Sequence, residues 1–406
     1  MRVAILESIV MPAGHEVEFD RILINELKQQ GHEPVLFVPE NFPFKVDYGV
    51  DIVDLEGGEV VTYAGASKWK KPFLSILRER RRRSWFISAA QKIKEHKIDA
   101  LIIPTGTYRY IKALLDTPLK DSEASVHVIF HGIGKGEMDR FIKQAHRANA
   151  YKNLYLDVIS LRDDMLRPNL PRVRKILPPV FLPSSELNGE QGNCVTQGNT
   201  SIQDKKDANS TTCIGTNLES PISTNKPIKL GFFGQFRKEK NIERFIDAFV
   251  SLNYDDSVQL VVQGATVKPE DGILFESIIK KYNQYSNIKF IHASLIGKDW
   301  DTALLSVDAL LLPYGAERYR YHWAAMLFTA IGFHKPVLIS PEINPEVLEQ
   351  YSIGEFLNLD DVHSIRQGIQ TFVKNLQHHK EQYNQGLMNA NEDYSHRALI
   401  QSIIHV

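Results

Sequence analysis

The sequence predicts an α/β protein built from two doubly wound, Rossmann-like domains in tandem. In both halves, short β-branched runs alternate with longer segments of helical period, which is the pattern of parallel strands joined by crossover helices. At 406 residues the chain is too long for one compact core. A polar stretch also divides it near the middle. These observations place a first domain at residues 1–183, a polar insert at 184–226 and a second domain at 227–388.

Five strands and a first crossover helix are expected in the first domain. The helix, at residues 18–30, carries an apolar stripe that includes Phe19, Leu23 and Leu27, and Gly31 ends it. Because right-handed crossovers are the default, these strands should form one parallel sheet. The expected strands are residues 3–6, 34–38, 100–103, 126–130 and 157–160.

The second domain repeats the same alternation of strands and helices. Two such domains joined by a linker leave a cleft between them, and α/β proteins usually bind ligands at the carboxyl ends of their strands. We therefore expect the functional site in that cleft. The expected strands are residues 230–233, 259–263, 288–291, 309–312 and 336–339, and the expected helices are residues 242–252, 274–284, 299–306 and 322–331.

Composition and charge indicate a folded chain that is not embedded in a membrane. Apolar residues make up 43%, charged residues 24%, and the net charge is -1. The insert is too polar to fold alone, so we expect a flexible linker, and its Cys194 and Cys213 are expected to be free thiols unless the protein meets an oxidising compartment. No signal peptide and no run of roughly 20 apolar residues is found, which favours a cytoplasmic protein.

The segment with the clearest chemistry is residues 231–241, which reads GFFGQFRKEKN between a strand and a helix. Glycine allows close backbone approach, the helix N-terminus offers unpaired N–H groups, and Arg237 and Lys240 flank the turn. An arginine fork and a lysine point charge can together hold a pyrophosphate as it becomes a leaving group. The alternative is that both are ordinary solvated cations of a loop.

This segment resembles the glycine, arginine and lysine turn that opens the second domain of family-four glycosyltransferases, also called group one. The resemblance continues in order over the next hundred or so residues, through the strand that ends at Gly264, the strand at residues 287–292, residues 306–314 and the turn at residues 332–337. It implies the GT-B fold, with the two domains facing each other across a cleft and a C-terminal helix, residues 389–406, packed back on the first domain.

The resemblance also implies how a nucleotide-sugar donor is bound. Arg237 and Lys240 would stabilise the leaving diphosphate, without a metal ion or any cofactor besides the donor, and the sugar would be transferred with retention of configuration. The remaining donor contacts would come from Gly234, Gln263, Gly264, Ala293 and Leu295, where backbone groups near residues 293–296 contact the base.

One departure from the family concerns sugar recognition. Family members carry two glutamates around the sugar-binding loop, and alignment on Pro336 places Tyr321 and Thr329 at those positions. Glu317 could replace them by reaching in from the loop, where Tyr319, Arg320, Tyr321 and His322 also offer hydrogen-bonding groups to sugar hydroxyls or phosphates. The alternative is a surface loop with packed aromatic side chains.

The first domain offers candidates for the acceptor side. His131 ends a buried strand at the cleft edge, where an imidazole could orient a sugar hydroxyl or move a proton, or could simply be bonded to backbone. A resembling histidine lines the donor-sugar site in several family members. Gly14, His15 and Glu16 follow the first strand, with Glu18 just beyond, and could face the acceptor or form a solvated turn. Residues 105–108 close another strand at the same edge.

A basic and aromatic run at residues 68–86 suggests a partner surface. Its cations include Arg80 to Arg83, and its aromatic residues include Trp69 and Phe73. Cations with interfacial aromatic side chains suit an anionic membrane surface, as a lipid-linked acceptor would require. A solvated helix face is the alternative. Nucleic acid is the weakest partner, since no recognised nucleic-acid module accompanies the run.

The function expected is hexosyl transfer from a nucleotide-diphosphate donor to a glycan or lipid-linked acceptor in cell-surface polysaccharide or glycoconjugate synthesis. No clustered carboxylate, His or Cys residues mark a metal site, and the sparse acids argue against a two-carboxylate hydrolase. Two alternatives stay open: a nucleotide-sugar 2-epimerase of similar architecture, and a glycosyltransferase-like partner subunit that has lost catalysis with its glutamates.

Overall fold

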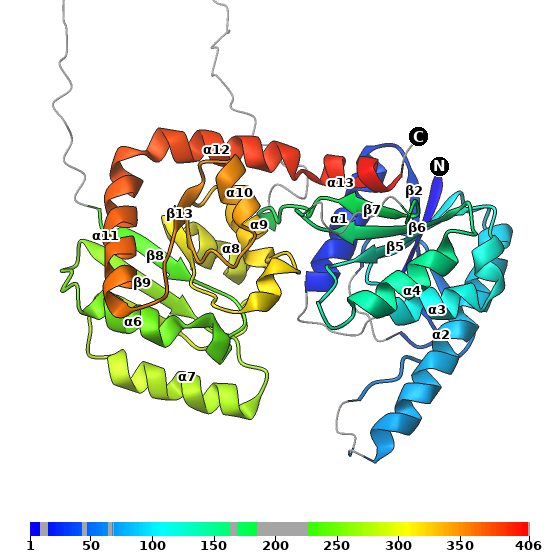
Figure 1. The fold of residues 1–406 in the computed structure, drawn as a ribbon, viewed down its shortest axis with the longest axis horizontal. Coiled ribbons are helices and arrows are strands. Elements are labelled where there is room, and N and C mark those ends of the chain that lie inside the picture. Colours follow the sequence, from blue (N-terminus) through cyan, green and yellow to red (C-terminus); the bar gives the residue numbers. More distant parts are fainter. Residues whose placement is uncertain are drawn as a thin grey trace, which may run out of the picture.

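A computed structural model describes residues 1–8, 15–42, 47–63, 67, 69–162, 169–184 and 226–404. The chain forms two α/β domains side by side, and each contains one parallel sheet with helices on both faces (Figure 1). The predicted fold class is therefore confirmed. The two cysteines and most of the polar insert lie outside the described residues.

The first sheet contains seven strands among the described residues, in the order β3-β2-β1-β4-β5-β6-β7, and every neighbouring pair is parallel. The central strands of this sheet are buried on both faces, and their sequences are therefore continuous apolar runs. Strand β4, for example, is buried along its whole length. The strands are β1 (Arg2–Leu6), β2 (Glu33–Pro39), β3 (Ile52–Leu55), β4 (Ala100–Ile103), β5 (Ser125–Phe130), β6 (Leu154–Ile159) and β7 (Val173–Ile176).

All five strands expected in this domain are confirmed, and the two that were missed are the edge strands. Strand β3 contains Asp54, and β7 contains Arg174 and Lys175, so neither shows a buried apolar pattern. Charged residues on edge strands discourage pairing with other chains, and they also conceal the strand from pattern analysis.

The helices of the first domain cover the sheet, except that one end of α2 projects beyond the domain (Figure 1). The later half of α2 is anchored, since Trp85 and Phe86 are buried and the Trp85 indole N–H donates to the Gly58 carbonyl at 2.8 Å. The helices are α1 (His15–Gln29), α2 (Lys70–Glu95), α3 (Tyr108–Leu115) and α4 (Met138–Ala148). Among the described residues, no helix combines the length and apolar character that crossing a membrane requires.

The second sheet contains six strands within the described part, in the order β10-β9-β8-β11-β12-β13, again all parallel. The five strands expected here are confirmed, and only the short edge strand β13 was missed. The strands are β8 (Ile228–Phe232), β9 (Val258–Gln263), β10 (Ile288–Ile291), β11 (Ala309–Leu312), β12 (Val337–Ile339) and β13 (Gly354–Phe356).

The helices of this domain follow the predicted order with shifted starts. Helix α7 begins at Pro269 instead of residue 274, because proline suits the first turn, and α9 begins at Ala325 instead of residue 322. The helices are α6 (Ile242–Val250), α7 (Pro269–Tyr282), α8 (Gly297–Leu305), α9 (Ala325–Gly332), α10 (Pro345–Gln350), α11 (Val362–His378) and α12 (Lys380–Asp393).

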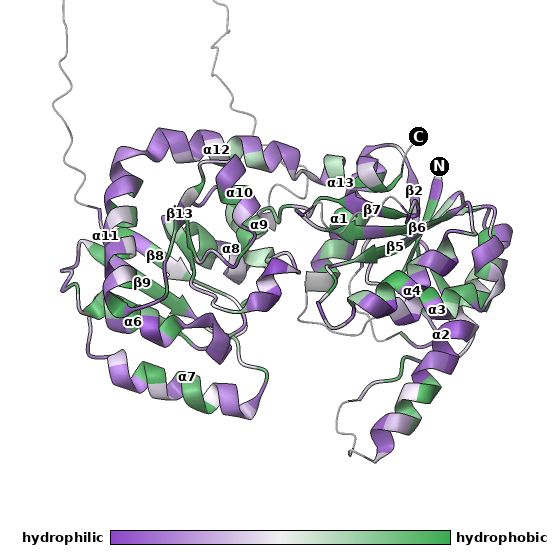
Figure 2. Cartoon of the chain, viewed as in Figure 1, coloured by the Kyte–Doolittle hydropathy of each residue, from purple (hydrophilic) through white to green (hydrophobic). Residues whose placement is uncertain are grey.

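Hydropathy follows this architecture. Apolar residues concentrate in the strands of both sheets, and hydrophilic residues dominate helices such as α11 and α12 (Figure 2). The interior of each domain is therefore the layer between its sheet and its helices.

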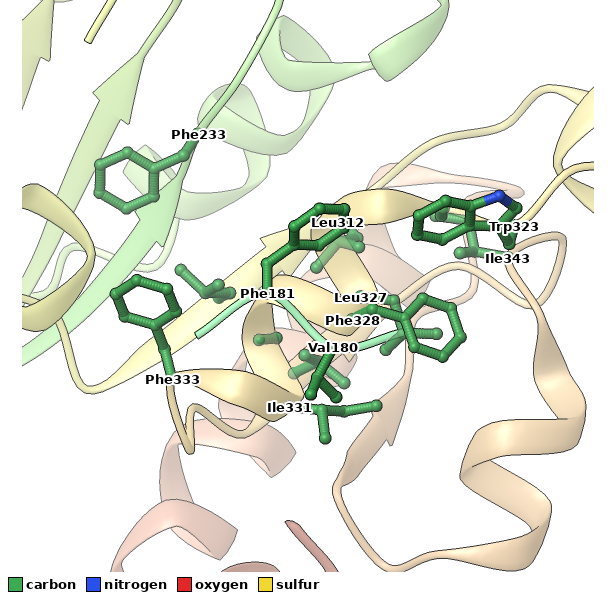
Figure 3. Close-up of a cluster of buried hydrophobic side chains, with 14 of the residues drawn as sticks. Val180, Phe181, Phe233, Leu312, Trp323, Leu327, Phe328, Ile331, Phe333 and Ile343 are labelled. Atoms are coloured by element: carbon green, nitrogen blue, oxygen red, sulfur yellow. The ribbon is translucent and has the colours of Figure 1, made fainter. Parts of the chain in front are cut away.

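The segment that leaves the first domain docks into the second. Val180 and Phe181 lie among apolar side chains of the second domain, including Phe328 and Ile331 of α9 (Figure 3). The Phe181 N–H donates to the Phe328 carbonyl at 3.3 Å, and the Val180 N–H donates to the Tyr394 carbonyl at 3.0 Å. The backbone of this segment is thus hydrogen-bonded to the second domain, and it joins the two domains.

The C-terminus returns to the first domain. The single helix expected at residues 389–406 is wrong: α12 ends at Asp393, and a separate helix α13 (His396–Ile403) starts after Ser395, whose side chain accepts from the Ala398 N–H. Helix α13 packs on α1 and β7. Arg174 on β7 donates to the Ile403 carbonyl at 3.0 Å and to the buried Asp157 carboxylate at 2.7 Å.

The close approach at the junction requires a glycine on α9. A Cβ on Gly332 would lie 2.1 Å from the Phe181 carbonyl oxygen, which is backbone and has no freedom to move alone. We expect Gly332→Ala to lower the free energy of unfolding by about 1–3 kcal/mol, as overpacking does. Chemical denaturation measures this change. Gly136→Ala is the matched control, because no atom lies within 4 Å of its added Cβ. Equal stability of both variants would contradict the close approach.

Candidate functional site

The carboxyl ends of strands from both sheets meet at the domain boundary. The loop after β5 contacts the loop after β11: the His322 ring N–H donates to the His131 carbonyl at 3.1 Å, and Lys135 lies 4.0 Å from Glu317. A Cβ on Gly132, whose φ is +103°, would lie 2.4 Å from the Tyr321 carbonyl oxygen. This is the edge at which α/β proteins bind ligands.

A tight turn after β8 opens the site. Gly234 has φ +106°, a conformation that favours glycine, and its N–H donates to the Gln263 side chain at 2.7 Å. Gln235 and Phe236 then pair with Ala265 of the loop after β9. Gln263 and the loop after β9 therefore hold this turn in place, just before Arg237 and Lys240 in the chain.

Lys240 lies behind this turn and is almost fully buried. It ends a short 3₁₀ turn (Lys238–Lys240), after which Asn241, with φ 52°, starts α6. Its Nζ donates to the Tyr314 hydroxyl at 3.4 Å and lies 4.5 Å from the centre of that ring. Burial, together with the charges of Arg237 and Arg318, lowers the Lys240 pKa to about 7.

Two guanidiniums complete a cationic cluster around Lys240, and Glu239 is the acid between them. Glu239 lies 3.9 Å from Arg237 and 3.5 Å from Arg318. Arg237 also donates to the Gln235 side chain at 2.7 Å, and Arg318 donates to the Tyr319 hydroxyl at 2.8 Å. With three cations and one carboxylate, the cluster suits an anion with more than one charge.

The first turn of α9 adds to this positive potential. A Cβ on Gly234 would lie 3.6 Å from Lys240 Nζ and 3.7 Å from Met326 Sδ, so the lysine and the start of α9 both lie close to the glycine. Helix N-termini carry unpaired N–H groups and a partial positive charge, which favours anions. Gly234, Lys240 and the α9 N-terminus therefore surround one small region.

Gln263 positions the site from within. It is buried at the end of β9, and its amide accepts from the Gly234 N–H and donates to the Ala293 carbonyl at 2.5 Å. Its side chain thus ties the turn after β8 to the loop after β10. Gly264 is required for packing, because a Cβ there would lie 2.8 Å from the Phe275 ring.

Leu295 does not share its groove with the cations. It lines a groove of about 560 Å³ beside β9, β10 and α8, together with Val261, Ile291 and Thr302. None of the three clustered cations lines this groove. The structure therefore brings together Gly234, Arg237, Lys240, Gln263 and Ala293, and it places Leu295 on a groove that these cations do not line.

The loop expected to recognise the sugar faces the first domain. Glu317 begins a 3₁₀ turn (Glu317–Arg320) and is exposed beside Lys135. Tyr321 and His322 contact the loop that follows His131. Thr329 is buried in α9, where its hydroxyl donates to the Ala325 carbonyl at 3.0 Å, so this family-glutamate position lies inside the helix packing.

His131 belongs to an aromatic contact between the domains. Its Nε2–H donates to the Pro104 carbonyl at 2.8 Å, which assigns the proton to that nitrogen. The ring lies edge-on to Phe19 at 4.7 Å and 5.8 Å from Trp323 of the second domain. One ring nitrogen of His131 is therefore bonded to backbone and its ring is packed against aromatic side chains. This agrees with the alternative that the histidine is bonded to backbone.

Of the acceptor-side candidates that follow the first strand, only Glu18 has a described side chain. Gly14 and the side chains of His15 and Glu16 lie outside the described part of the structure. Glu18 lies 3.2 Å from Arg21. Burial raises the Glu18 pKa, Arg21 lowers it, and Asp301 of α8 raises it, so this carboxylate faces the second domain.

Arg318 is the functional candidate that the sequence did not reveal. It lies 78 positions after Lys240 along the chain, and only Glu239 and the fold bring the two cations together. A run of arginines and tyrosines at residues 318–321 was the available signal, but it did not indicate which side chain turns towards Lys240. Among the described residues, no group of His, Cys, Asp and Glu side chains is suited to hold a metal ion.

Comparisons with known proteins agree with this geometry. A family model described as Glycosyl transferases group 1 matches residues 216–387. No curated protein matches the chain significantly.

Solved structures resemble nearly the whole chain. A glycosyltransferase from Rickettsia africae is 12% identical with a TM-score of 0.64, covering 98% of this chain and 96% of that one. HepE from Anabaena, solved in complex with UDP, is 13% identical with a TM-score of 0.62, covering 99% and 98%. WaaG, a glycosyltransferase involved in lipopolysaccharide biosynthesis, is 14% identical with a TM-score of 0.55 and full coverage of both chains. The chain therefore has the GT-B fold of these structures, and residues 216–387 match the model of the group 1 glycosyltransferases.

Proposed function

We propose that the protein transfers a hexosyl group from a nucleoside-diphosphate donor to a carbohydrate or lipid-linked acceptor, with retention of configuration and without a metal ion. The observation that carries the proposal is the buried Lys240 beside Arg237 and Arg318, behind the Gly234 turn. Three cations with one acid among them suit a leaving diphosphate, whose charge grows as the glycosidic bond breaks.

The cluster can act on that charge in two ways. The guanidinium of Arg237 offers a planar fork to phosphate oxygens, while Lys240 contributes a compact charge from a buried position. Because Lys240 is held in a desolvated site, its attraction for an incoming diphosphate is screened little by solvent. These fixed cations would supply the positive charge that a divalent metal supplies elsewhere, and this supports a metal-independent reaction.

The comparisons support the choice of donor and acceptor class. HepE has been solved with UDP and with UDP-glucose, so UDP is the first nucleotide to test here. WaaG acts in lipopolysaccharide biosynthesis, which is consistent with a glycan or lipid-linked acceptor in cell-surface synthesis. The proposal of retention rests on the resemblance of the second domain to group 1.

The projecting end of α2 supports an acceptor held at a membrane. Trp69, Phe73 and Ile76 are 94%, 70% and 70% exposed and lie at helical spacing on one stripe, next to Lys70 and Lys71. Apolar side chains flanked by cations fit an anionic lipid surface.

The arginines further along α2 have other partners. Arg82 is buried against Glu79 at 2.8 Å, Arg83 bonds Asp116 at 2.7 Å, and Arg81 donates to the Gly57 carbonyl at 2.5 Å. Three of the four cations at positions 80–83 therefore stabilise the first domain. The proposed membrane contact is limited to the exposed tip of α2, residues 69–76.

Removing the two predicted cations should impair donor binding. For Arg237→Ala with Lys240→Ala, we expect UDP affinity to fall at least about tenfold. Release of UDP from UDP-glucose should fall about 100-fold, because charge stabilisation of the leaving group is lost. Calorimetry and a UDP-release assay measure the two effects. Lys238→Ala, an exposed cation of the same turn, is the matched control and should change neither value appreciably. Wild-type values in the double variant would refute the assignment.

The lowered pKa of Lys240 predicts a proton linked to binding. At pH 8 the lysine is mostly neutral in the free protein, since its pKa is about 7. A bound diphosphate stabilises the charged form, so UDP binding should take up as much as about one proton, and affinity should fall as the pH rises above 7. Calorimetry in buffers of different ionisation enthalpy counts the protons. Uptake should persist in Lys238→Ala and vanish in Lys240→Ala, and equal uptake in both would contradict the linkage.

The exposed tip of α2 predicts binding to anionic vesicles. Trp69→Ser with Phe73→Ser should reduce co-sedimentation with phosphatidylglycerol vesicles several-fold, because the apolar area available for burial is lost. The control is Val267→Ser with Ile273→Ser, whose side chains are 74% and 73% exposed in the second domain. If both double variants sediment like the wild type, α2 is not the membrane contact.

A further inference from the structure

A second cationic cluster lies in the first domain, where arginines gather on two tyrosines. Tyr108, the first residue of α3, accepts hydrogen bonds from Arg109 Nε at 3.2 Å and from Arg140 Nη1 at 3.3 Å. Both guanidinium carbons also lie within 6 Å of the centre of the Tyr108 ring, at 5.7 and 5.6 Å. Two exposed guanidiniums are thus held on one side chain.

Helix α2 extends the cluster with a third arginine. The Arg78 guanidinium lies 5.5 Å from the centre of the Tyr63 ring. The Tyr63 pKa is lowered by the Ser75 hydroxyl and also by Arg78 and Arg109, so Arg109 lies close enough to act on both tyrosines. Three helices, α2, α3 and α4, therefore bring Arg78, Arg109 and Arg140 to one surface.

The positive charge of this cluster is not neutralised. Among the residues that the structure describes, none of the three guanidiniums forms an ion pair. Glu79 is the carboxylate whose charge reaches Arg109, and it is paired with Arg82 at 2.8 Å. Arginines held by tyrosine hydroxyls and ring faces keep most of their N–H donors for an anion.

The position of the cluster relates it to the active site. Tyr108 follows the carboxyl end of β4, and Arg140 lies in the first turn of α4, after the loop that follows β5. That loop contacts the second domain through Lys135 and Glu317. The cluster is therefore on the ligand-binding edge of the first sheet, and Arg78 is two residues from Ile76 on the exposed tip of α2.

We propose that Arg78, Arg109 and Arg140, with Tyr63 and Tyr108, form a binding site for a phosphate group carried by the acceptor. This deepens the proposed function and rests on it for the role of acceptor. Guanidinium forks and phenolic hydroxyls match phosphate oxygens, and the two cationic clusters, one in each domain, would hold donor and acceptor separately.

The test compares inorganic phosphate binding in paired variants by calorimetry. Arg109→Gln with Arg140→Gln should weaken phosphate binding about tenfold or more, since two charge-assisted contacts are lost. The matched control is Lys112→Gln with Lys143→Gln, which removes two exposed cations one turn further along the same helices and should leave phosphate binding unchanged. Equal phosphate affinity in the arginine variant and the wild type overturns the proposal.

The same experiment distinguishes a failure of the proposed phosphate site from a failure of the proposed donor site. Arg109→Gln with Arg140→Gln should bind UDP like the wild type, and Arg237→Ala with Lys240→Ala should retain phosphate binding that depends on Arg109 and Arg140. If the latter variant still binds UDP normally, the donor assignment fails while the phosphate site stands. Loss of all phosphate binding in that variant overturns the phosphate site instead.

Two further arms identify the source of the phosphate group. Weaker binding of glucose 6-phosphate by the arginine variant, with unchanged sedimentation on phosphatidylglycerol vesicles, assigns the site to a soluble phosphorylated acceptor. Weaker sedimentation on those vesicles, but not on phosphatidylcholine vesicles, assigns it to a lipid phosphate. No change in either arm overturns the role in acceptor binding.

Discussion

Two close backbone approaches constrain how the two domains meet. At Gly332 the linker carbonyl of Phe181 occupies the space that a side chain would need, and at Gly132 the carbonyl of Tyr321 does the same. Together they bring the carboxyl ends of both sheets to one boundary. The contact between Lys135 and Glu317 and the aromatic contact of His131 with Trp323 depend on that placement, because each joins the two domains. The cationic cluster lies next to them, since Arg318 directly follows Glu317.

The electrostatics of the proposed donor site follow from burial more than from the number of charges. Lys240 is 7% exposed and lies against the Tyr314 ring, whereas Lys238, two residues earlier, is exposed to solvent. Desolvation of an ammonium near two guanidiniums is unfavourable, and the protein responds with a lowered pKa. A charge held in so desolvated a site gains more from a nearby anion than an exposed charge does, which is what the proposed binding of a diphosphate requires.

Much of the fold could be predicted from the sequence, because central parallel strands carry continuous apolar runs. The strands that were missed, β3, β7 and β13, are short edge strands, and the break at Tyr394 between α12 and α13 was hidden by two helical patterns in succession. Within the site, Arg237 and Lys240 could be predicted from their place between a strand and a helix. The partnership of Lys240 with Arg318 could not, since it depends on tertiary contact through Glu239. Tertiary contacts of α2 could not be predicted either. The helical spacing indicates which face of α2 carries Arg82, but it does not reveal that this side chain is buried against Tyr110.

The chain crosses between the domains twice, and the two crossings are bonded to each other. The Val180 N–H donates to the Tyr394 carbonyl, and the His396 ring donates to the Val180 carbonyl at 2.8 Å. The first crossing leads into the second domain and the second leads back to the first, so hydrogen bonds combine them into one double connection. Any rotation of one domain relative to the other would therefore have to bend both crossings at the same place, beside Val180 and Tyr394.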